Sequence, residues 1–367
     1  MFPNPGISLL AYRRVMRLAP AVTLAAGLAA GLVLLAGVAG CTGDGDPPTT
    51  GAPPPLSAPT SAPTGQTSAP PATPSPTPPT PSTPSTLSAS PEPARADPAE
   101  VRTRVAMDAV RHLATDIGPR PGTSPAFREA AAWVAGQLRG SGWEVDRRSF
   151  PVPAGSSVAG PTEGLPVAAG RSANVVATRG DVVPGQPWLL VGAHLDTVPT
   201  SPGAEDNASG IGVLLAVADA VAQRRTRLPV VLVAFGAEEP RGPGDDDHHY
   251  GSRAYVASLD PAARRSLRGM IALDRVGTGT ATPVGSAEAG DPLRAEVLAV
   301  ADRLGLATVA ETGQRSSDHW SFVRAGLPGI RLGSTPYAGY HSPDDVVSVV
   351  DPGPLSRAAR IVVGWLR

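Results

Sequence analysis

The chain predicts an α/β fold in which helices cover both faces of one mixed, largely parallel sheet. Two observations lead to this expectation. Residues 228–235 form a nearly continuous β-branched apolar run, which is typical of a strand covered on both faces. Apolar residues with helical spacing, as in 99–114 and 209–222, alternate with such strand-like runs along the chain. That alternation is typical of a single α/β/α domain.

Each element of this domain is expected from its own pattern. In 99–114 the apolar residues recur every three or four positions, and His112 on this helix is interpreted as structural. The glycines after 139 and the turn at 181–185 separate neighbouring elements. The expected helices are 99–114, 125–139, 209–222, 292–304 and 354–366, and the expected strands are 144–152, 173–178, 188–193, 228–235, 270–273 and 329–332.

Residues 1–41 predict an export signal. Arg13, Arg14 and Arg17 precede an apolar run over 21–38, which ends in Val-Ala-Gly-Cys41. This ending resembles a bacterial lipobox, which implies cleavage before Cys41 and its lipidation, and hence an extracytoplasmic domain anchored to the membrane. Cys41 is the single cysteine of the chain, so no intramolecular disulfide can form. An uncleaved membrane anchor is the alternative, and Sec and twin-arginine export both remain open.

Residues 42–97 predict a disordered tether. They are rich in Pro, Ser, Thr and Ala and contain almost no large apolar residue, so burial cannot offset their ordering entropy. The alternative is a Pro-rich recognition ligand. The remaining 98–367 are long enough for one α/β domain with a sizeable core.

The charged residues exclude some classes of function. The net charge is −1, so the chain has no basic footprint for nucleic acid. All 31 residues counted as Lys or Arg are arginine, which excludes Schiff-base and Ser-Lys chemistry.

Metal-ligating side chains follow the expected strands. His194, Asp196 and Asp206 lie within 192–210, just after the apolar run 188–191. An imidazole and carboxylates at a strand end suit a borderline metal such as zinc. A surface loop could carry this segment alone by chance, so the hypothesis depends on further ligands downstream.

Three more acidic or histidine segments occupy equivalent places. Glu238 and Glu239 follow the buried run 228–235, Asp274 ends another apolar run, and His341 follows the last strand and its loop. Carboxyl ends of strands are where α/β sheets place their sites. Each segment alone could be a helix cap or a solvated loop, but four in this position favour one common site.

On these residues the domain resembles the zinc aminopeptidases of peptidase family M28, in particular the secreted bacterial ones, most strongly over 192–345. The resemblance implies the zinc-peptidase α/β/α fold and two Zn²⁺ ions per chain. It implies that one ion binds His194 and Asp274, the other binds Glu239 and His341, and Asp206 bridges them.

The resemblance also implies the catalytic roles. Glu238 corresponds to the general base that takes the proton of the attacking water. Asp196 suits an acceptor that orients the imidazole of His194. Tyr340 corresponds to a tyrosine that in some relatives donates a hydrogen bond to the developing oxyanion. Supporting roles are expected for Asp318 and Asp345, and a weak one for His319.

The segment 240–250 departs from the family pattern. Its sequence, PRGPGDDDHHY, is longer than expected between the Glu-Glu pair and Gly251-Ser252. Its acids and histidines could bind an extra cation or shape the substrate entrance, and a solvated charged loop is the alternative.

Rival functions share parts of this pattern. Glutaminyl cyclases look similar and use a single zinc, and a non-catalytic binding domain of the same fold would have lost ligands. Carboxypeptidases and deacylases of related sequence carry an inserted dimerisation domain, for which the 34 residues between Glu239 and Asp274 leave no room. The sequence therefore predicts an exported, monomeric two-zinc aminopeptidase acting on peptides, with its preferred residue and its metal in vivo left open.

Overall fold

The computed structural model describes residues 92–158 and 160–367. The expected export signal, Cys41 and the expected tether up to residue 91 lie outside these residues. Packed structure begins slightly before residue 98: the backbone N–H of Ala96 donates to the carbonyl of Arg225, and Ala96 is fully buried. None of the helices in the described ranges has the length and apolar character that a membrane span needs.

Helices and strands alternate through most of the described chain. The strands are β1 (Glu144–Val152), β2 (Gly155–Ser156), β3 (Pro166–Val167), β4 (Gly170–Thr178), β5 (Trp188–His194), β6 (Val230–Phe235), β7 (Leu267–Asp274), β8 (Thr282–Gly285), β9 (Thr308–Glu311) and β10 (Ile330–Gly333). The α-helices are α1 (Thr103–Arg111), α2 (Pro125–Gly140), α3 (Gly210–Val221), α4 (Tyr250–Ser258), α5 (Pro261–Ser266), α6 (Pro292–Arg303), α7 (His319–Arg324) and α8 (Pro352–Leu366). Shorter helical turns are η1 (Pro98–Glu100), η2 (His112–Ile117), η3 (Gly160–Thr162), η4 (Ala204–Ser209), η5 (Asp245–Asp247) and η6 (Val347–Val349).

One eight-stranded mixed sheet holds the domain together, in the order β1-β4-β6-β5-β7-β10-β8-β9. The four central strands β6, β5, β7 and β10 are parallel to one another, whereas β4 and β8 pair antiparallel to their inner neighbours. The expected fold class is confirmed. The short strands β8 and β9 and the helices α4, α5 and α7 were not expected, since their four to nine residues carry little apolar periodicity.

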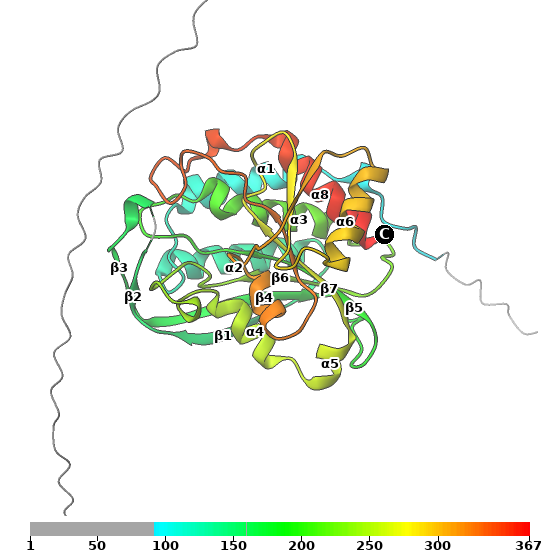
Figure 1. The fold of residues 1–367 in the computed structure, drawn as a ribbon, viewed down its shortest axis with the longest axis horizontal. Helices are drawn as coiled ribbons and strands as arrows, with labels where there is room; N and C mark the ends of the chain where they lie inside the picture. The colour runs from blue at the N-terminus through cyan, green and yellow to red at the C-terminus, as the bar shows by residue number, and fades with distance from the viewer. Residues whose placement is uncertain (1–91, 159) are drawn as a thin grey trace, which may run out of the picture. The chain divides into compact units, whose positions relative to one another are not determined.

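Side chains of the central strands alternate between two cores because successive residues of a strand point to opposite faces. In β5, Leu189 and Val191 join the core under α1, α2, α3, α6 and α8, whereas Leu190 faces the core under α4 and α7. Figure 1 shows α1, α3, α6 and α8 on one side of the sheet and α4 and α5 on the other. This two-sided burial explains why these strands read as continuous apolar runs.

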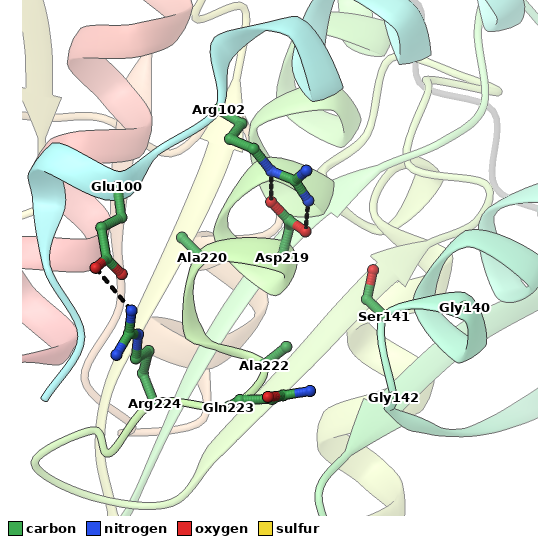
Figure 2. A pocket seen from close by; sticks show the side chains of 10 residues that line it. All are labelled: Glu100, Arg102, Gly140, Ser141, Gly142, Asp219, Ala220, Ala222, Gln223 and Arg224. Carbon is green, nitrogen blue, oxygen red and sulfur yellow. Dashed lines mark hydrogen bonds and ion pairs between the residues drawn. The ribbon is translucent and has the colours of Figure 1, made fainter. Parts of the chain in front are cut away.

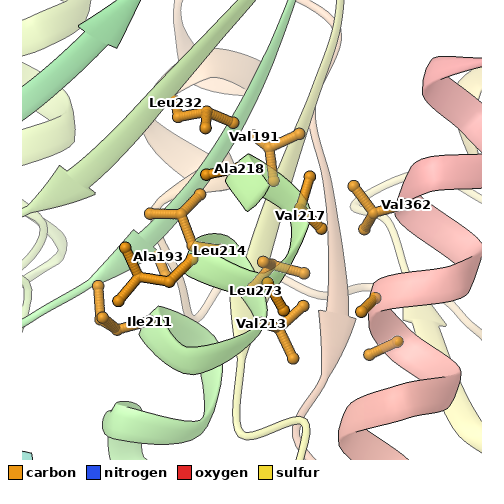
Figure 3. Close-up of a cluster of buried hydrophobic side chains, with 14 of the residues drawn as sticks. Val191, Ala193, Ile211, Val213, Leu214, Val217, Ala218, Leu232, Leu273 and Val362 are labelled. Atoms are coloured by element: carbon orange, nitrogen blue, oxygen red, sulfur yellow. The ribbon is translucent and has the colours of Figure 1, made fainter. Parts of the chain in front are cut away.

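The helix α3 lies against the middle of the sheet. Its Leu214 lies beside Ala193 of β5 and its Val217 faces Val362 of α8, as Figure 3 shows. A side chain at Gly212 would place its Cβ 2.6 Å from the carbonyl oxygen of Ala106, so glycine is required for α1 to approach this helix. The buried α3 fixes the loop before it, which carries Asp206.

Candidate metal centre

Five metal-ligating side chains meet at the carboxyl edge of the parallel strands. His194 ends β5, Asp274 ends β7, Glu239 lies four residues beyond β6, and His341 lies in the loop after β10. The fifth, Asp206, lies in η4 just before α3. The strands β5 and β7 are neighbours, but the chain leaves β5 for β6 on one side and leaves β7 for β8 on the other. Ligands of α/β sheets bind where the connections of two neighbouring strands diverge in this way.

Asp206 lies at the centre of this cluster, with a different histidine at each carboxylate oxygen. Oδ1 lies 3.1 Å from Nε2 of His194, and Oδ2 lies 3.4 Å from Nε2 of His341. Beyond the two histidines lie two more carboxylates: Nε2 of His194 is 3.7 Å from Oδ1 of Asp274, and Nε2 of His341 is 3.1 Å from Oε2 of Glu239. The cluster is therefore two histidine–carboxylate pairs sharing one aspartate.

The donor set fits a cation. One ligand atom each from His194, Asp206 and Glu239 lie within 4.8 Å of one another, and all three residues are buried. Oε1 of Glu239 and Oδ1 of Asp274 are buried and accept no hydrogen bond in the described part of the chain. Buried carboxylates without hydrogen bonds are costly unless a positive charge lies beside them.

The pKa values reflect the same concentration of negative charge. Burial raises the pKa of Asp206, but hydrogen bonds from His194 and His341 outweigh it and hold that pKa well below its usual range. Burial lowers the pKa of His341, but Glu239 and Asp206 raise it to about 11. The surrounding carboxylates therefore favour the protonated form of both imidazoles when no metal is bound.

Asp196 holds the Glu238–Glu239 segment by its backbone. Oδ1 accepts the N–H of Glu238 at 2.9 Å and Oδ2 accepts the N–H of Glu239 at 3.2 Å. The expected contact to His194 differs in detail, because Nδ1 donates to the backbone carbonyl of Asp196 at 3.2 Å while the carboxylate lies 3.9 Å away. The carbonyl thus orients the imidazole, and the carboxylate orients the two glutamates.

Glu238 points to a different partner from that of Glu239. Its Oε1 lies 3.1 Å from Nε2 of His249, and its carbonyl accepts the backbone N–H of the same histidine. Burial, with the nearby charges of Asp274 and Asp196, raises the pKa of Glu238 to about 8. A carboxyl group with a pKa near neutrality, beside the metal-ligating cluster, is suited to accept and release a proton.

The loop that presents Asp206 is held by groups distant in sequence. Asp345 accepts the backbone N–H of Glu205 at 2.7 Å and of Asp206 at 3.0 Å, and Tyr337 donates its hydroxyl to the same carboxylate. The peptide bond between Asp206 and Asn207 is cis, and the Asn207 amide donates to the carbonyl of Leu273 in β7. Asp345 thus has the supporting position expected for it.

Tyr340 and Arg275 form the wall beside His341. The ring of Tyr340 stacks on His341 with centroids 3.8 Å apart, and the Arg275 guanidinium lies 4.5 Å from the Tyr340 ring centre. The Tyr340 hydroxyl has no hydrogen-bond partner among the described residues. Arg275 follows Asp274 directly, and the sequence analysis did not single it out.

Backbone strain concentrates around the cluster. Ala237, His249, Arg275 and His341 all have φ between 52° and 56°, a left-handed conformation that non-glycine residues seldom adopt. Such residues cost about 1–3 kcal/mol each and gather at functional sites. Ala237 directly precedes Glu238, Arg275 directly follows Asp274, and His341 is itself part of the cluster. The strained backbone therefore lies in the segments that carry the side chains of the site.

A fully buried arginine supports the loop after β5. Arg120 donates to the carbonyls of Leu195, Pro202 and Gly203. The sequence analysis missed it because its partners lie about 80 residues away and no local pattern marks them.

The two residues at the start of α7 have different environments. Burial and the charge of Glu238 raise the pKa of Asp318 to about 7, so it lies within electrostatic reach of the cluster. His319 instead contacts the carbonyl of Gln314 at 3.0 Å, and burial lowers its pKa to about 3. His319 does not line the pocket over Asp206.

The acids and histidines of 240–250 separate in space. His248 and His249 line the pocket, whereas Asp246 pairs with Arg324 and Asp247 accepts the N–H of Gly244. In the described ranges the five residues Asp245, Asp246, Asp247, His248 and His249 form no group that could hold an ion. The histidines therefore belong to the entrance, and the aspartates shape the loop.

The pocket over the cluster has a volume of about 140 Å³. A larger hollow of about 640 Å³ lies elsewhere, between the start of α1, the end of α3 and the turn before β1. Figure 2 shows its charges already paired, Arg102 with Asp219 and Arg224 with Glu100. Of the two hollows, the smaller pocket is the one in which buried carboxylates and histidines meet, so it is the candidate site.

Fold and cluster together define an α/β protein with a histidine–carboxylate cluster that could hold a metal at the carboxyl edge of its sheet. The model of peptidase family M28 matches residues 174–366, and the chain belongs to this family. Aminopeptidase YwaD of Bacillus subtilis is 29% identical over 47% of this chain and 39% of its own length. The probable lipoprotein aminopeptidase LpqL of Mycobacterium tuberculosis is 29% identical over 48% of this chain and 33% of its own length.

Solved structures share the fold. The zinc aminopeptidase BSAP of Bacillus subtilis superimposes with a TM-score of 0.62 at 17% identity, over 72% of this chain and 94% of that one. The glutaminyl cyclase of Porphyromonas gingivalis superimposes with a TM-score of 0.60 at 23% identity, over 72% of this chain and 98% of that one. The matches to YwaD and LpqL span well under half the length of those two relatives.

Proposed function

We propose that the chain is a two-zinc metallopeptidase that removes N-terminal residues from peptides. The observation that carries this proposal is the central position of Asp206, whose two carboxylate oxygens face two different histidines. A carboxylate that faces two ligand sets is suited to bridge two cations. Membership of peptidase family M28 and the printed names of YwaD and BSAP support an aminopeptidase that uses zinc.

Each ion would have its own set of ligands. His194 and Asp274 would complete one site with Oδ1 of Asp206, and Glu239 and His341 would complete the other with Oδ2. Nitrogen and carboxylate oxygen donors of this kind suit zinc. Two zinc ions would lower the pKa of a shared water and polarise the scissile carbonyl.

Glu238 is the proposed general base. It accepts a proton from the attacking water and delivers it to the leaving amine, since its carboxylate is buried and is not in the two ligand pairs. Asp196 keeps Glu238 in register with Glu239 by accepting both backbone N–H groups. Tyr340 is proposed to donate its unpaired hydroxyl to the oxyanion of the substrate, an effect worth about 2.7–4 kcal/mol for one well-placed donor.

Metal content and turnover of the purified chain test this proposal. The panel contains aminoacyl nitroanilides and N-terminal glutaminyl peptides, assayed with wild type, Glu238→Gln and the control Glu288→Gln, whose side chain is exposed. We expect two zinc ions per chain and release of nitroaniline that stops with a chelator. Glu238→Gln should keep its zinc and lose about 10²–10⁴-fold in kcat, because it lacks only the base.

The same panel separates the rival functions. One zinc per chain with cyclisation of N-terminal glutamine, and no release of nitroaniline, would assign the glutaminyl cyclase activity instead. Neither metal nor turnover in the wild type would leave a binding domain of this fold.

We further propose that the domain is monomeric and acts outside the cytoplasm, held to the membrane by a lipid on Cys41. The Val-Ala-Gly-Cys41 sequence and the printed description of LpqL as a probable lipoprotein support this location. In cells labelled with a fatty-acid probe, the wild type should carry the label and sediment with membranes. Cys41→Ser should carry no label and leave the membrane fraction, and a label that persists in this variant would contradict the proposal.

A further inference from the structure

Arg275 is a cation built into the wall of the candidate site. It lines the pocket directly after Asp274, and its side chain is only 15% exposed. Three contacts fix its place: the backbone N–H donates to Asn207, Nε lies 3.6 Å from Oδ1 of Asp274, and the guanidinium covers the Tyr340 ring. The side chain is thus held rigidly at the edge of the pocket.

The terminal nitrogens of Arg275 have no hydrogen-bond partner among the described residues. Other buried arginines use theirs on the protein: Arg241 donates to the carbonyls of Pro153 and Ala168, and Arg120 donates to several carbonyls. A rigid guanidinium fork with free donors matches the two oxygens of a carboxylate. Arg275 is therefore placed to bind a ligand, whereas Arg120 and Arg241 hold loops.

The charge of the pocket favours the same ligand. Four carboxylates line it, those of Asp206, Glu238, Glu239 and Asp274, and two divalent ions at the proposed sites offset them. The positive charge of Arg275 then has no negative charge left in the pocket lining to balance it.

We propose that Arg275 binds a carboxylate of the substrate and gives the site a preference for peptides with a negative charge next to the scissile bond. That carboxylate comes either from an acidic N-terminal side chain or from the free C-terminus of a dipeptide. The inference rests on the proposed peptidase function and names its substrate class. The competing role, an arginine that only offsets the buried acids, predicts the same effect on every substrate.

Two matched substrate pairs test the proposal with the full chain in its zinc-loaded form. The first pair is glutamyl and leucyl nitroanilide, and the second is the dipeptide Leu-Gly and its C-terminal amide. They are assayed with wild type, Arg275→Lys, Arg275→Met and the exposed control Arg303→Met. Wild type should prefer the charged member of at least one pair by about tenfold or more in kcat/KM, the size expected for a charged hydrogen bond. The pair that shows the preference identifies the source of the carboxylate.

The variants separate recognition from charge balance. Arg275→Met should bring the preferred pair to a ratio near one by slowing the charged member alone, Arg275→Lys should lie between, and Arg303→Met should match wild type. Equal losses for both members of a pair in Arg275→Met would overturn the proposal. So would a wild type that hydrolyses leucyl nitroanilide but shows no preference within either pair. Both results would leave the peptidase function in place.

Calorimetry gives a readout that does not depend on turnover. Binding of L-glutamate and of L-leucine, the amino-acid products of the first pair, is measured for each variant after its zinc content and circular dichroism have been checked. Tighter binding of glutamate by wild type, lost in Arg275→Met and partly kept in Arg275→Lys, supports the proposal. Equal binding of both amino acids by wild type excludes the acidic side chain as the source of the carboxylate, and together with no preference in the Leu-Gly pair it contradicts the proposal. Absence of any hydrolysis by wild type would refute the peptidase function, and calorimetry would still decide the role of Arg275.

Discussion

Asp196→Asn is the substitution that probes the arrangement of the two glutamates most directly. The wild-type carboxylate accepts the backbone N–H of Glu238 with one oxygen and that of Glu239 with the other. Asparagine has nearly the same shape, but only one of its terminal atoms is an acceptor. Its NH₂ group would face a backbone N–H, so one hydrogen bond is lost and two donors are brought together.

The size of the effect follows from that lost bond. A hydrogen bond to a charged group contributes about 1.5–3 kcal/mol, which corresponds to about 10- to 150-fold in an equilibrium constant. Asp196 is 1% exposed, so water cannot replace the missing acceptor. Because the bond positions the proposed base and a proposed ligand, we expect kcat/KM to fall by about 10- to 150-fold and the free energy of unfolding to fall by about 1.5–3 kcal/mol.

The assay combines nitroanilide kinetics, zinc content and urea unfolding of wild type and Asp196→Asn. Asp302→Asn serves as the control, because Asp302 is exposed and its carboxylate has no described partner. An Asp196→Asn enzyme with kcat/KM within twofold of wild type and an unchanged unfolding midpoint would refute the role given to this carboxylate. So would an equal effect of Asp302→Asn.

Two further predictions follow from the core and from the charge of the cluster. Trp365→Ala should lower the free energy of unfolding by about 3–5 kcal/mol, because Trp365 is 1% exposed in the core between α8 and the sheet; a loss below about 1 kcal/mol in urea unfolding would contradict this packing. Zinc binding to the metal-stripped chain at pH 7 should release protons, because Glu239 and Asp206 raise the pKa of His341 to about 11 and a ligating imidazole must be neutral. The sign follows from the raised pKa: the histidine is protonated below it, so zinc affinity should rise with pH up to that value. Calorimetry in buffers of different ionisation enthalpy measures the release, and a binding heat that does not depend on the buffer would contradict it.

The sequence predicted those elements whose burial produces a recognisable run or spacing of apolar residues along the chain. The strand β6 is apolar on both faces, so its residues form a run that no surface strand would show. The helix α4 was missed because it is short and mixes Gly, Ser and Arg with only two buried apolar side chains, Tyr255 and Val256. Its place in the fold depends on contacts with the sheet, which local spacing does not encode.

The sequence indicated which residues form the candidate site, but not the hydrogen bonds that hold them. His194 and Asp274 each end a strand and His341 lies in the loop after one, and the structure brings the three together around Asp206. The hydrogen bond from Asp206 to Asp345 joins residues 139 positions apart, and such pairings depend on how loops fold over the sheet edge.

The direction of individual side chains was also beyond the sequence. Asp196 was expected to contact the His194 imidazole with its carboxylate, but the carboxylate turns to the backbone of Glu238 and Glu239. The positive φ of Arg275 places its side chain in the pocket wall, and no spacing rule marks a residue for that conformation.

The proposed bridging of two zinc ions by Asp206 can be tested on a crystal of the zinc-loaded domain by anomalous scattering at the zinc edge. We expect two peaks about 3.5–4 Å apart, one beside His194 and Asp274, the other beside Glu239 and His341, with one oxygen of Asp206 directed at each. A single peak at full zinc occupancy, or two peaks that Asp206 does not contact together, would contradict it.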